Sequence, residues 1–115
     1  MVDDDENLLQ VTGDYLESRG HAITRCNDPM LAVETAKTLL PDLAIVDYEM
    51  PGLSGTHLVT ALHQEPALSE LPIIFLSGID ALTYASQVRP DPRIRFLHKP
   101  VKMKELDEMI ADILE

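Results

Sequence analysis

The sequence has little of several features on which specialised protein classes depend. Among its 115 residues there is one cysteine, Cys26, which cannot form an internal disulfide and which we expect to be a small buried hydrophobic residue. No apolar run approaches the roughly 18 residues of a membrane span, and the start lacks the cationic and apolar regions of a secretion signal. These absences predict a soluble, cytoplasmic protein without a membrane partner.

Basic residues and aromatic residues are also scarce. Nine Lys and Arg stand against 20 Asp and Glu, and the formal net charge of −11 would repel a phosphate backbone. We therefore expect no direct binding of nucleic acid, whereas basic partners and metal ions suit such a surface. Aromatic residues make up 4% of the chain and hydrophobic residues 45%, which predicts one domain, residues 1–115, with a mainly aliphatic core.

Short apolar runs alternate with amphipathic segments along the chain. The predicted strands are 1–2, 21–26, 42–47, 72–77 and 94–98, and the predicted helices are one that ends at Gly20, 29–40, 56–64, 80–88 and one around 103–113. Strict alternation of apolar strands with helices predicts an α/β fold with a single five-stranded parallel sheet and five helices on its two faces. The flavodoxin-like order 2-1-3-4-5 fits, with a switch point between the first and third strands.

The first predicted strand is unusually short. Only Met1 and Val2 precede the acidic pair Asp3 and Asp4, whereas strands usually have about 5–6 residues. We therefore expect this strand to be truncated at the N-terminus. Because it is central in the predicted order, its loss should expose the neighbouring strands and destabilise the fold.

Polar side chains follow four of the predicted strands at one edge of the sheet. Asp3 and Asp4 follow the first strand, and Asp47, Ser77 and Lys99 end or follow the third, fourth and fifth. Each has an ordinary explanation alone, such as a turn or a helix start. Two unit charges about 4 Å apart, however, repel by roughly 4 kcal/mol at an effective dielectric of 20. Three clustered carboxylates therefore predict a cation, and such hard oxygen ligands suit Mg²⁺.

Asp47 is then a candidate nucleophile, because carboxylates form aspartyl-phosphate intermediates. Phosphoryl transfer depends mainly on positioning and on neutralising the phosphoryl oxygens. Mg²⁺ and Lys99 would neutralise such oxygens, and the hydroxyl of Ser77 would donate a hydrogen bond to another. The alternative for Lys99 is a structural ion pair with Asp47.

These residues lie within motifs that resemble those of the receiver domain of two-component response regulators. The resemblance spans essentially the whole chain, in the family's order and spacing, and rests on Val2–Asp4, Ile45–Asp47, Met50–Gly52 with Gly55, Leu76–Gly78 and His98–Pro100. It implies that Asp47 accepts a phosphoryl group from a sensor histidine kinase or a phosphotransfer protein. It also implies a cis peptide between Lys99 and Pro100.

The resemblance implies further roles around the phosphoacceptor. Mg²⁺ would be bound directly by Asp4 and by the phosphoacceptor, through water by Asp3, and by the backbone carbonyl of Glu49. Ser77 and Lys99 would bind the phosphoryl oxygens. The domain would thus carry out its own phosphorylation and dephosphorylation and would not be a conventional enzyme.

The resemblance also implies a conformational switch. Phe96 matches the aromatic switch residue, which rotates inward when Ser77 moves toward the phosphate, although a plain core role for Phe96 is the alternative. The output face would consist of the helix at 80–88, the following strand and the last helix, and it would contact an effector domain, a partner or a second copy. Glu49 and Ile79 match the positions that tune hydrolysis of the phosphoryl group.

Two other functions compete with this one. A phosphatase of the haloacid dehalogenase type also uses an aspartate nucleophile with Mg²⁺, but it needs a second carboxylate two residues later, for which Glu49 is an imperfect substitute. The chain is also short for such an enzyme and has no cap to exclude water. The third possibility is an interaction module that works without phosphorylation, which the complete set of chemical residues disfavours.

Overall fold

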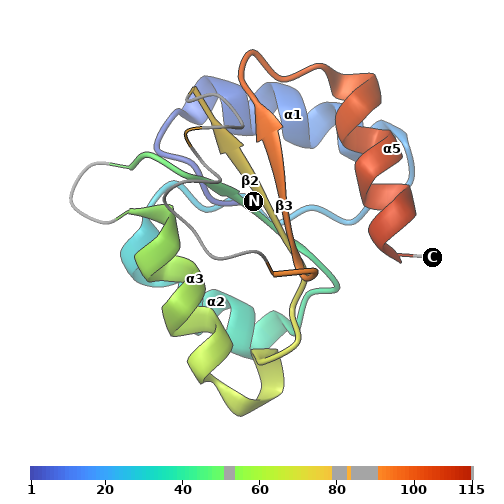
Figure 1. The fold of residues 1–115 in the computed structure, drawn as a ribbon. Helices are drawn as coiled ribbons and strands as arrows, with labels where there is room; N and C mark the ends of the chain where they lie inside the picture. Colours follow the sequence, from blue (N-terminus) through green and yellow to red (C-terminus); the bar gives the residue numbers. More distant parts are fainter. Residues whose placement is uncertain (51–53, 79–82, 84–90, 115) are drawn as a thin grey trace.

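The computed structural model describes residues 1–50, 54–78, 83 and 91–114 (Figure 1). Its elements are α1 (Glu6–Ser18), α2 (Pro29–Leu39), β1 (Ala44–Asp47), α3 (Gly55–Gln64), the 3₁₀ helix η1 (Pro66–Leu68), β2 (Ile73–Ser77), β3 (Ile94–His98) and α5 (Met103–Leu114). Four of the five predicted helices are thereby confirmed. The helix predicted at 80–88 falls almost entirely outside the described residues. None of the described helices is long and apolar enough to span a membrane.

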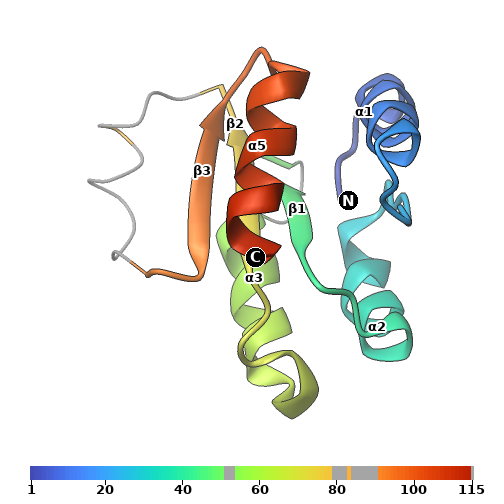
Figure 2. The same ribbon diagram turned by 90° about the vertical axis from the view of Figure 1, so that its right-hand side faces the viewer.

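Three of the five predicted strands form a regular parallel sheet. β2 lies between β1 and β3, and Phe75 in its centre is in register with Val46 on one side and Phe96 on the other. Figure 2 shows β3, β2 and β1 in succession across the sheet. Their apolar runs predicted these strands because a central parallel strand is buried on both faces.

The other two predicted strands are reduced to single residues. Val2 forms isolated parallel bridges with Cys26 and Val46, so it lies between them in the order expected for the first strand. The strand predicted at 21–26 is not confirmed, because residues 21–25 form no strand and only Cys26 is paired. The physical reason is that a strand needs a paired neighbour, and among the described residues the bridge between Val2 and Cys26 is the only sheet pairing of this segment. Among the described residues the sheet therefore has three regular strands, and the predicted five strands are not confirmed.

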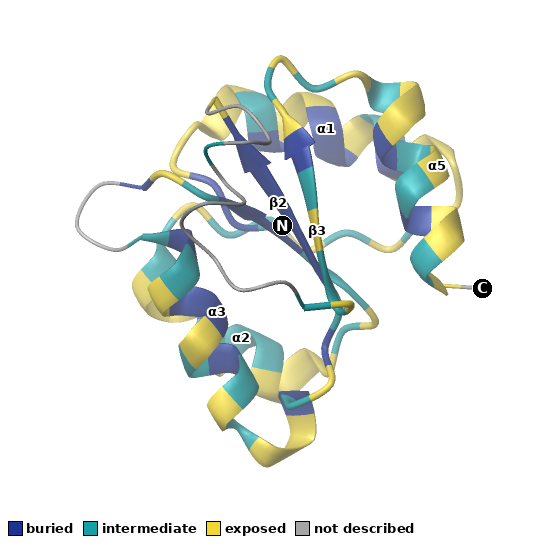
Figure 3. Ribbon diagram, viewed as in Figure 1, coloured by how far each residue is buried: buried dark blue, intermediate teal, exposed yellow. Residues whose placement is uncertain are grey.

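Helices cover both faces of the sheet. α1 and α5 lie on one side, and α2 and α3 lie on the other (Figures 1 and 2). Successive residues of β2 serve the two sides in turn: Ile73 and Phe75 pack with the α2 and α3 residues, while Ile74 and Leu76 pack with residues of α1 and α5. β2 is buried along its whole length (Figure 3). The core therefore consists of two aliphatic layers separated by the sheet.

Helix starts follow local signals in the sequence. The side chain of Asp28 accepts a hydrogen bond from Met30 N at 2.9 Å, and Pro29 occupies the first turn of α2. Asp5 caps α1 in the same way, with its carboxylate 3.1 Å from Leu8 N. Such caps satisfy backbone donors that have no partner inside the helix. Asp5 thus has a structural role that is separate from that of the two acidic residues before it.

Candidate functional site

Asp47 is the last residue of β1, and its carboxylate is almost completely buried, with 4% of the residue exposed. Oδ1 accepts hydrogen bonds from Glu49 N and from Lys99 Nζ, both at 3.2 Å. The start of α3 lies close to this strand end, because a Cβ on Gly55 would be only 2.6 Å from Asp47 O and 2.9 Å from Tyr48 Cα. Glycine at position 55 therefore allows the helix to approach the end of β1.

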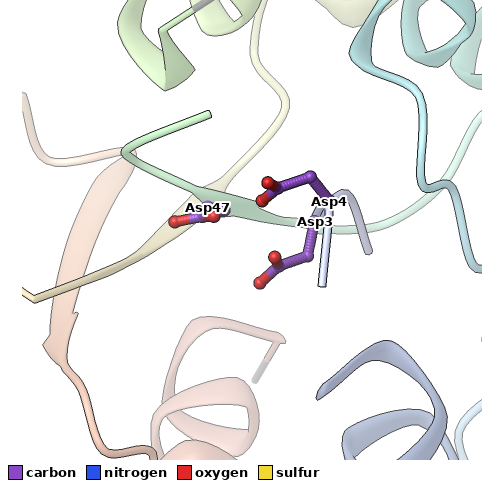
Figure 4. A group of neighbouring side chains, drawn as sticks. All are labelled: Asp3, Asp4 and Asp47. Atoms are coloured by element: carbon purple, nitrogen blue, oxygen red, sulfur yellow. The ribbon is translucent and has the colours of Figure 1, made fainter. Parts of the chain in front are cut away.

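Three carboxylates gather at this edge of the sheet. Carboxylate oxygens of Asp3, Asp4 and Asp47 lie within 4.8 Å of one another (Figure 4). The bridges of Val2 bring the first two beside the end of β1, since Asp47 N donates to Val2 O at 2.9 Å. The prediction that these residues converge is confirmed, although Asp4 and Asp47 are 43 positions apart in the sequence.

Asp3 is the most deeply buried member of the cluster. It has no exposed surface, and its Oδ1 accepts a hydrogen bond from Asp5 N at 2.9 Å. Its Oδ2 is buried without a hydrogen-bond partner among the described residues and lies 3.7 Å from Lys99 Nζ. Asp4, in contrast, is exposed to solvent. The site therefore has a buried interior and an open side.

The charges of the cluster are only partly compensated. Burial, with the adjacent charge of Asp3, raises the pKa of Asp47 to about 6, and burial also raises the pKa of Asp3. Burial by itself would lower the pKa of Lys99, but the charges of Asp3 and Asp47 outweigh it and the pKa is raised. One ammonium thus faces more negative charge than it can neutralise.

This arrangement fits a hard divalent cation. A buried carboxylate oxygen that accepts no hydrogen bond is costly unless another group satisfies it. Asp3 Oδ2 accepts no hydrogen bond from the described residues, although Lys99 Nζ lies 3.7 Å away, and one carboxylate oxygen each of Asp3, Asp4 and Asp47 lies within 4.8 Å of the others. Magnesium binds carboxylate oxygens while keeping open positions for water or phosphate oxygens. The donor set is therefore suited to Mg²⁺.

Ser77 reaches this site through Glu49. The hydroxyl of Ser77, which is fully buried at the end of β2, donates a hydrogen bond to Glu49 Oε1, and Gly78 N donates to the same oxygen at 3.2 Å. Lys99 N donates to Ser77 O at 2.6 Å, which ties the ends of β2 and β3 together. The sequence suggested a role for the backbone carbonyl of Glu49, but it gave no sign that the side chain binds these two donors.

Two further expectations concern β3. Phe96 is half-buried and packs with the apolar residues on the α2 and α3 side, so it is not one of the groups around the carboxylates. The cis peptide between Lys99 and Pro100 is confirmed. His98, which was not predicted as a site residue, has its Nε2 3.1 Å from Gly78 O, in the segment that follows Ser77.

Comparison with known proteins agrees with this geometry. The family model for the response regulator receiver domain matches residues 1–111. The protein RcaC of Microchaete diplosiphon is 30% identical over all 115 residues, and the phosphoglycerate transport system transcriptional regulatory protein PgtA of Salmonella typhimurium is 31% identical over 114 residues, or 99% of the chain. The chain spans only 18% and 27% of the lengths of these two relatives.

Solved structures show the same fold. A response regulator from Desulfuromonas acetoxidans superposes with a TM-score of 0.87 at 30% sequence identity, covering 98% of this chain and 92% of that one. Since the match extends over nearly the whole of both chains, the fold is that of flavodoxin-like receiver domains. The chain belongs to the family of response regulator receiver domains, the phosphorylation-dependent switches of two-component signalling.

Proposed function

We propose that Asp47 is the phosphoacceptor of this receiver domain and that a sensor histidine kinase or a phosphotransfer protein supplies the phosphoryl group. One observation carries this proposal. Asp47 is a buried carboxylate at the end of a central strand, and its Oδ1 lies 3.2 Å from Lys99 Nζ with two further carboxylates beside it. An aspartate that only starts a turn needs neither burial nor a lysine and two further carboxylates beside it.

The residues around Asp47 meet the needs of the transfer. An Asp47 oxygen attacks phosphorus, so that the O–P bond forms while the P–N bond to the donor histidine breaks. The Lys99 ammonium would form an ion pair with the phosphoryl oxygens instead of Asp47, and the Ser77 hydroxyl would donate a hydrogen bond to one of these oxygens. Mg²⁺, when bound, supplies further neutralisation of phosphoryl charge. Asp3, Asp4, Asp47 and the backbone carbonyl of Glu49 would hold it.

Phosphorylation would then change the surface of the domain. It adds about −1.5 to −2 charges next to Lys99 and to Ser77, which at rest are bound to Asp47 and Glu49 respectively. Movement of Ser77 toward the phosphate would alter the end of β2 and its link to β3, with Phe96 as the switch residue. The output face would comprise the segment at 80–88, β3 and α5, and would contact an effector domain, a partner or a second copy.

Several wider features belong to the same proposal. Residues 1–115 would form one receiver domain that works in the cytoplasm, where its kinase partner acts, without binding nucleic acid itself. Its chemistry would be limited to its own phosphorylation and dephosphorylation. Its complete sheet would have five strands in the order 2-1-3-4-5, of which the structure contains three as regular strands and two as single bridges.

Incubation with acetyl phosphate and Mg²⁺ tests the assignment of Asp47. The wild-type chain should gain the mass of one phosphoryl group, and Asp47→Asn should not. Asp42→Asn, which removes an exposed carboxylate just before β1, is the matched control and should behave as wild type. A gain that needs neither Mg²⁺ nor Asp47 would refute the proposal, and steady release of phosphate from an ester would indicate the phosphatase instead.

The side chain of Glu49 should tune this chemistry. Its Oε1 accepts from Ser77 Oγ and Gly78 N, so it occupies two donors that a phosphoryl group would use. We expect Glu49→Ala to be phosphorylated several-fold faster and to differ from wild type in phosphoryl lifetime. Glu49→Gln keeps the acceptor oxygen but removes the charge. Its phosphorylation rate should lie between those of wild type and Glu49→Ala. Equal rates and lifetimes in all three proteins would contradict this role. Ile79, the other predicted tuning position, lies outside the described residues.

A further inference from the structure

Two histidine side chains hold the backbone at the two ends of β2. His63 Nε2, in the last turn of α3, lies 2.9 Å from Leu71 O, shortly before the strand begins. His98 Nε2, at the end of β3, lies 3.1 Å from Gly78 O, directly after the strand. A carbonyl oxygen only accepts hydrogen bonds, so Nε2 is the donor in both contacts. The first contact is at the end of β2 away from the acidic cluster, whereas the second holds the residue that follows Ser77.

Both peptide groups that flank the Cα of Gly78 are held from the end of β3. Lys99 N donates to Ser77 O at 2.6 Å, which fixes the peptide group before this Cα. The His98 imidazole donates to Gly78 O, which fixes the peptide group after it. One of these bonds comes from the main chain and the other from a side chain. Two adjacent residues, His98 and Lys99, therefore set the direction of the Gly78 N–H.

Glycine benefits from such support more than any other residue. Without a Cβ it has the widest range of backbone dihedral angles, and fixing it costs the most conformational entropy. The φ of Gly78 lies outside the left-handed region, and a Cβ at this position would come no closer than 3.9 Å to the described residues, at Glu49 Oε2. Sterics therefore leave Gly78 free, and the contact with His98 restrains it.

The direction of the Gly78 N–H matters because this group faces an anion. Gly78 N donates to Glu49 Oε1 at 3.2 Å, and the hydroxyl of Ser77 donates to the same oxygen. Glu49 N in turn donates to Asp47 Oδ1 at 3.2 Å, so the anion lies beside the proposed phosphoacceptor. An N–H group that already points to the position of negative charge stabilises it without the cost of reorientation.

We propose that His98 is a positioning residue for phosphorylation and that it acts by holding the N–H of Gly78 toward the phosphoryl oxygens. The inference rests on the function proposed for Asp47. When the phosphoryl group arrives, it would take the place of the Glu49 carboxylate at this N–H. His98 would act only through Gly78, and it would not contact the phosphoryl group.

The contribution of this contact to stability should be small. His98 and Gly78 are both exposed to solvent, so water can replace the imidazole at Gly78 O. Loss of the side chain should therefore change the order of the Gly78 backbone more than the free energy of unfolding. A role in positioning and a role in stability thus predict different measurements.

The rate of phosphorylation by acetyl phosphate and Mg²⁺, followed by mass, tests the proposal. His98→Ala should react about two- to tenfold more slowly than wild type, the range expected for the loss of one hydrogen bond. His98→Gln should react nearly as fast as wild type, because its side-chain amide nitrogen is as many bonds from Cα as Nε2 is. His63→Ala removes a contact of the same kind at the other end of β2 and should leave the rate unchanged.

A second substitution separates positioning from a general loss of structure. Gly78→Ala restricts the backbone at this position, so His98→Ala combined with Gly78→Ala should react faster than His98→Ala alone. The ¹⁵N order parameter of the residue 78 amide reports its motion on the picosecond to nanosecond timescale. This parameter should fall in His98→Ala and should stay at the wild-type value in His98→Gln and His63→Ala.

The possible outcomes are distinct. Equal rates in wild type, His98→Ala and His98→Gln would overturn the proposal, and so would a fall in the order parameter without a change in rate. A loss of rate that neither His98→Gln nor Gly78→Ala relieves, or that His63→Ala reproduces, would also overturn it. A wild-type chain that gains no phosphoryl group would instead refute the role of Asp47, and this inference would fall with that role.

Discussion

The two edges of β1 are built very differently. On the edge toward β2, four residues of β1 are in register with four of β2, which has no exposed residue. On the opposite edge a single residue, Val2, bridges to Val46, and a cavity follows. The acidic cluster draws Asp47 from β1 itself, and Asp3 and Asp4 from the segment on its second edge. Its carboxylates therefore lie where the regularly paired side of β1 meets the side that has a single bridge.

The largest effect should come from the well-packed side. Phe75 is fully buried in β2 and makes an edge-to-face contact with Tyr48, with ring centroids 5.2 Å apart. Phe75→Ala should lower the free energy of unfolding by about 3–5 kcal/mol, because it removes a large buried side chain and leaves a cavity. Urea unfolding measures this. Val11→Ala, at an exposed position of α1, is the control, and a similar loss there would show that the method is not reporting on the core.

One pair of identical substitutions compares the two edges directly. Val46 is fully buried between β2 and Val2, whereas Val2 borders the cavity. Val46→Ala should cost about 2–3 kcal/mol, and Val2→Ala about 1 kcal/mol, because the second site already lacks contacts on one side. Equal losses in urea unfolding would mean that the two edges are equally well supported.

The buried carboxylate of Asp47 should lower the free energy of unfolding at neutral pH. Burial and the charge of Asp3 raise the pKa of Asp47 to about 6 in the folded chain, whereas a free carboxyl titrates near pH 4. The folded state therefore holds the proton more tightly, so Asp47 costs stability progressively as the pH rises from about 4 to about 6. Asp47→Asn should be more stable than wild type by about 1–2 kcal/mol at pH 7, since it removes a buried charge that Lys99 neutralises only in part.

Unfolding in urea at pH 4 and pH 7 measures this difference. The advantage of Asp47→Asn over wild type should be much smaller at the lower pH, where the carboxyl is protonated in the folded state and about half protonated in the unfolded chain. Mg²⁺ should stabilise the wild-type chain at pH 7 more than the variant, because a ligand that binds the folded state raises its stability. A variant that is less stable than wild type at pH 7 would contradict the electrostatic account.

The smallest effect is expected at a solvent-exposed ion pair far from both edges. Arg95 Nη2 lies 3.1 Å from Asp112 Oδ2, and both side chains are exposed to solvent. Asp112→Ala should change the free energy of unfolding by no more than about 0.5 kcal/mol. A larger loss in the same urea experiment would mean that β3 and α5 depend on this contact, and the third strand would then be less securely held than its register suggests.

The same difference between the edges explains which parts of the structure the sequence predicted. The strand ending at Asp47 and the one ending at Ser77 were predictable because all their residues except the partly buried Ala44 are buried, and buried strands have continuous apolar runs. The strand predicted at 21–26 was not confirmed at residues 21–25. The pairing of this segment depends on a neighbouring strand, which its own residues do not reveal. The contact between Glu49 and Ser77 was also missed, since no local pattern gives the direction of an exposed side chain.

The wide separation of the site residues along the chain has a consequence for synthesis. Asp3 and Asp4 come from the start of the chain, Asp47 from near its middle and Lys99 from close to its end. Chains are made from the N-terminus onward, so a growing chain has its proposed metal ligands and its proposed phosphoacceptor long before it has the ammonium that pairs with them. Under the proposed function, reactivity with a phosphoryl donor would therefore report that the residues from Asp3 to Lys99 have been made and folded. A kinase would act only on finished molecules, and an unfinished chain would send no signal.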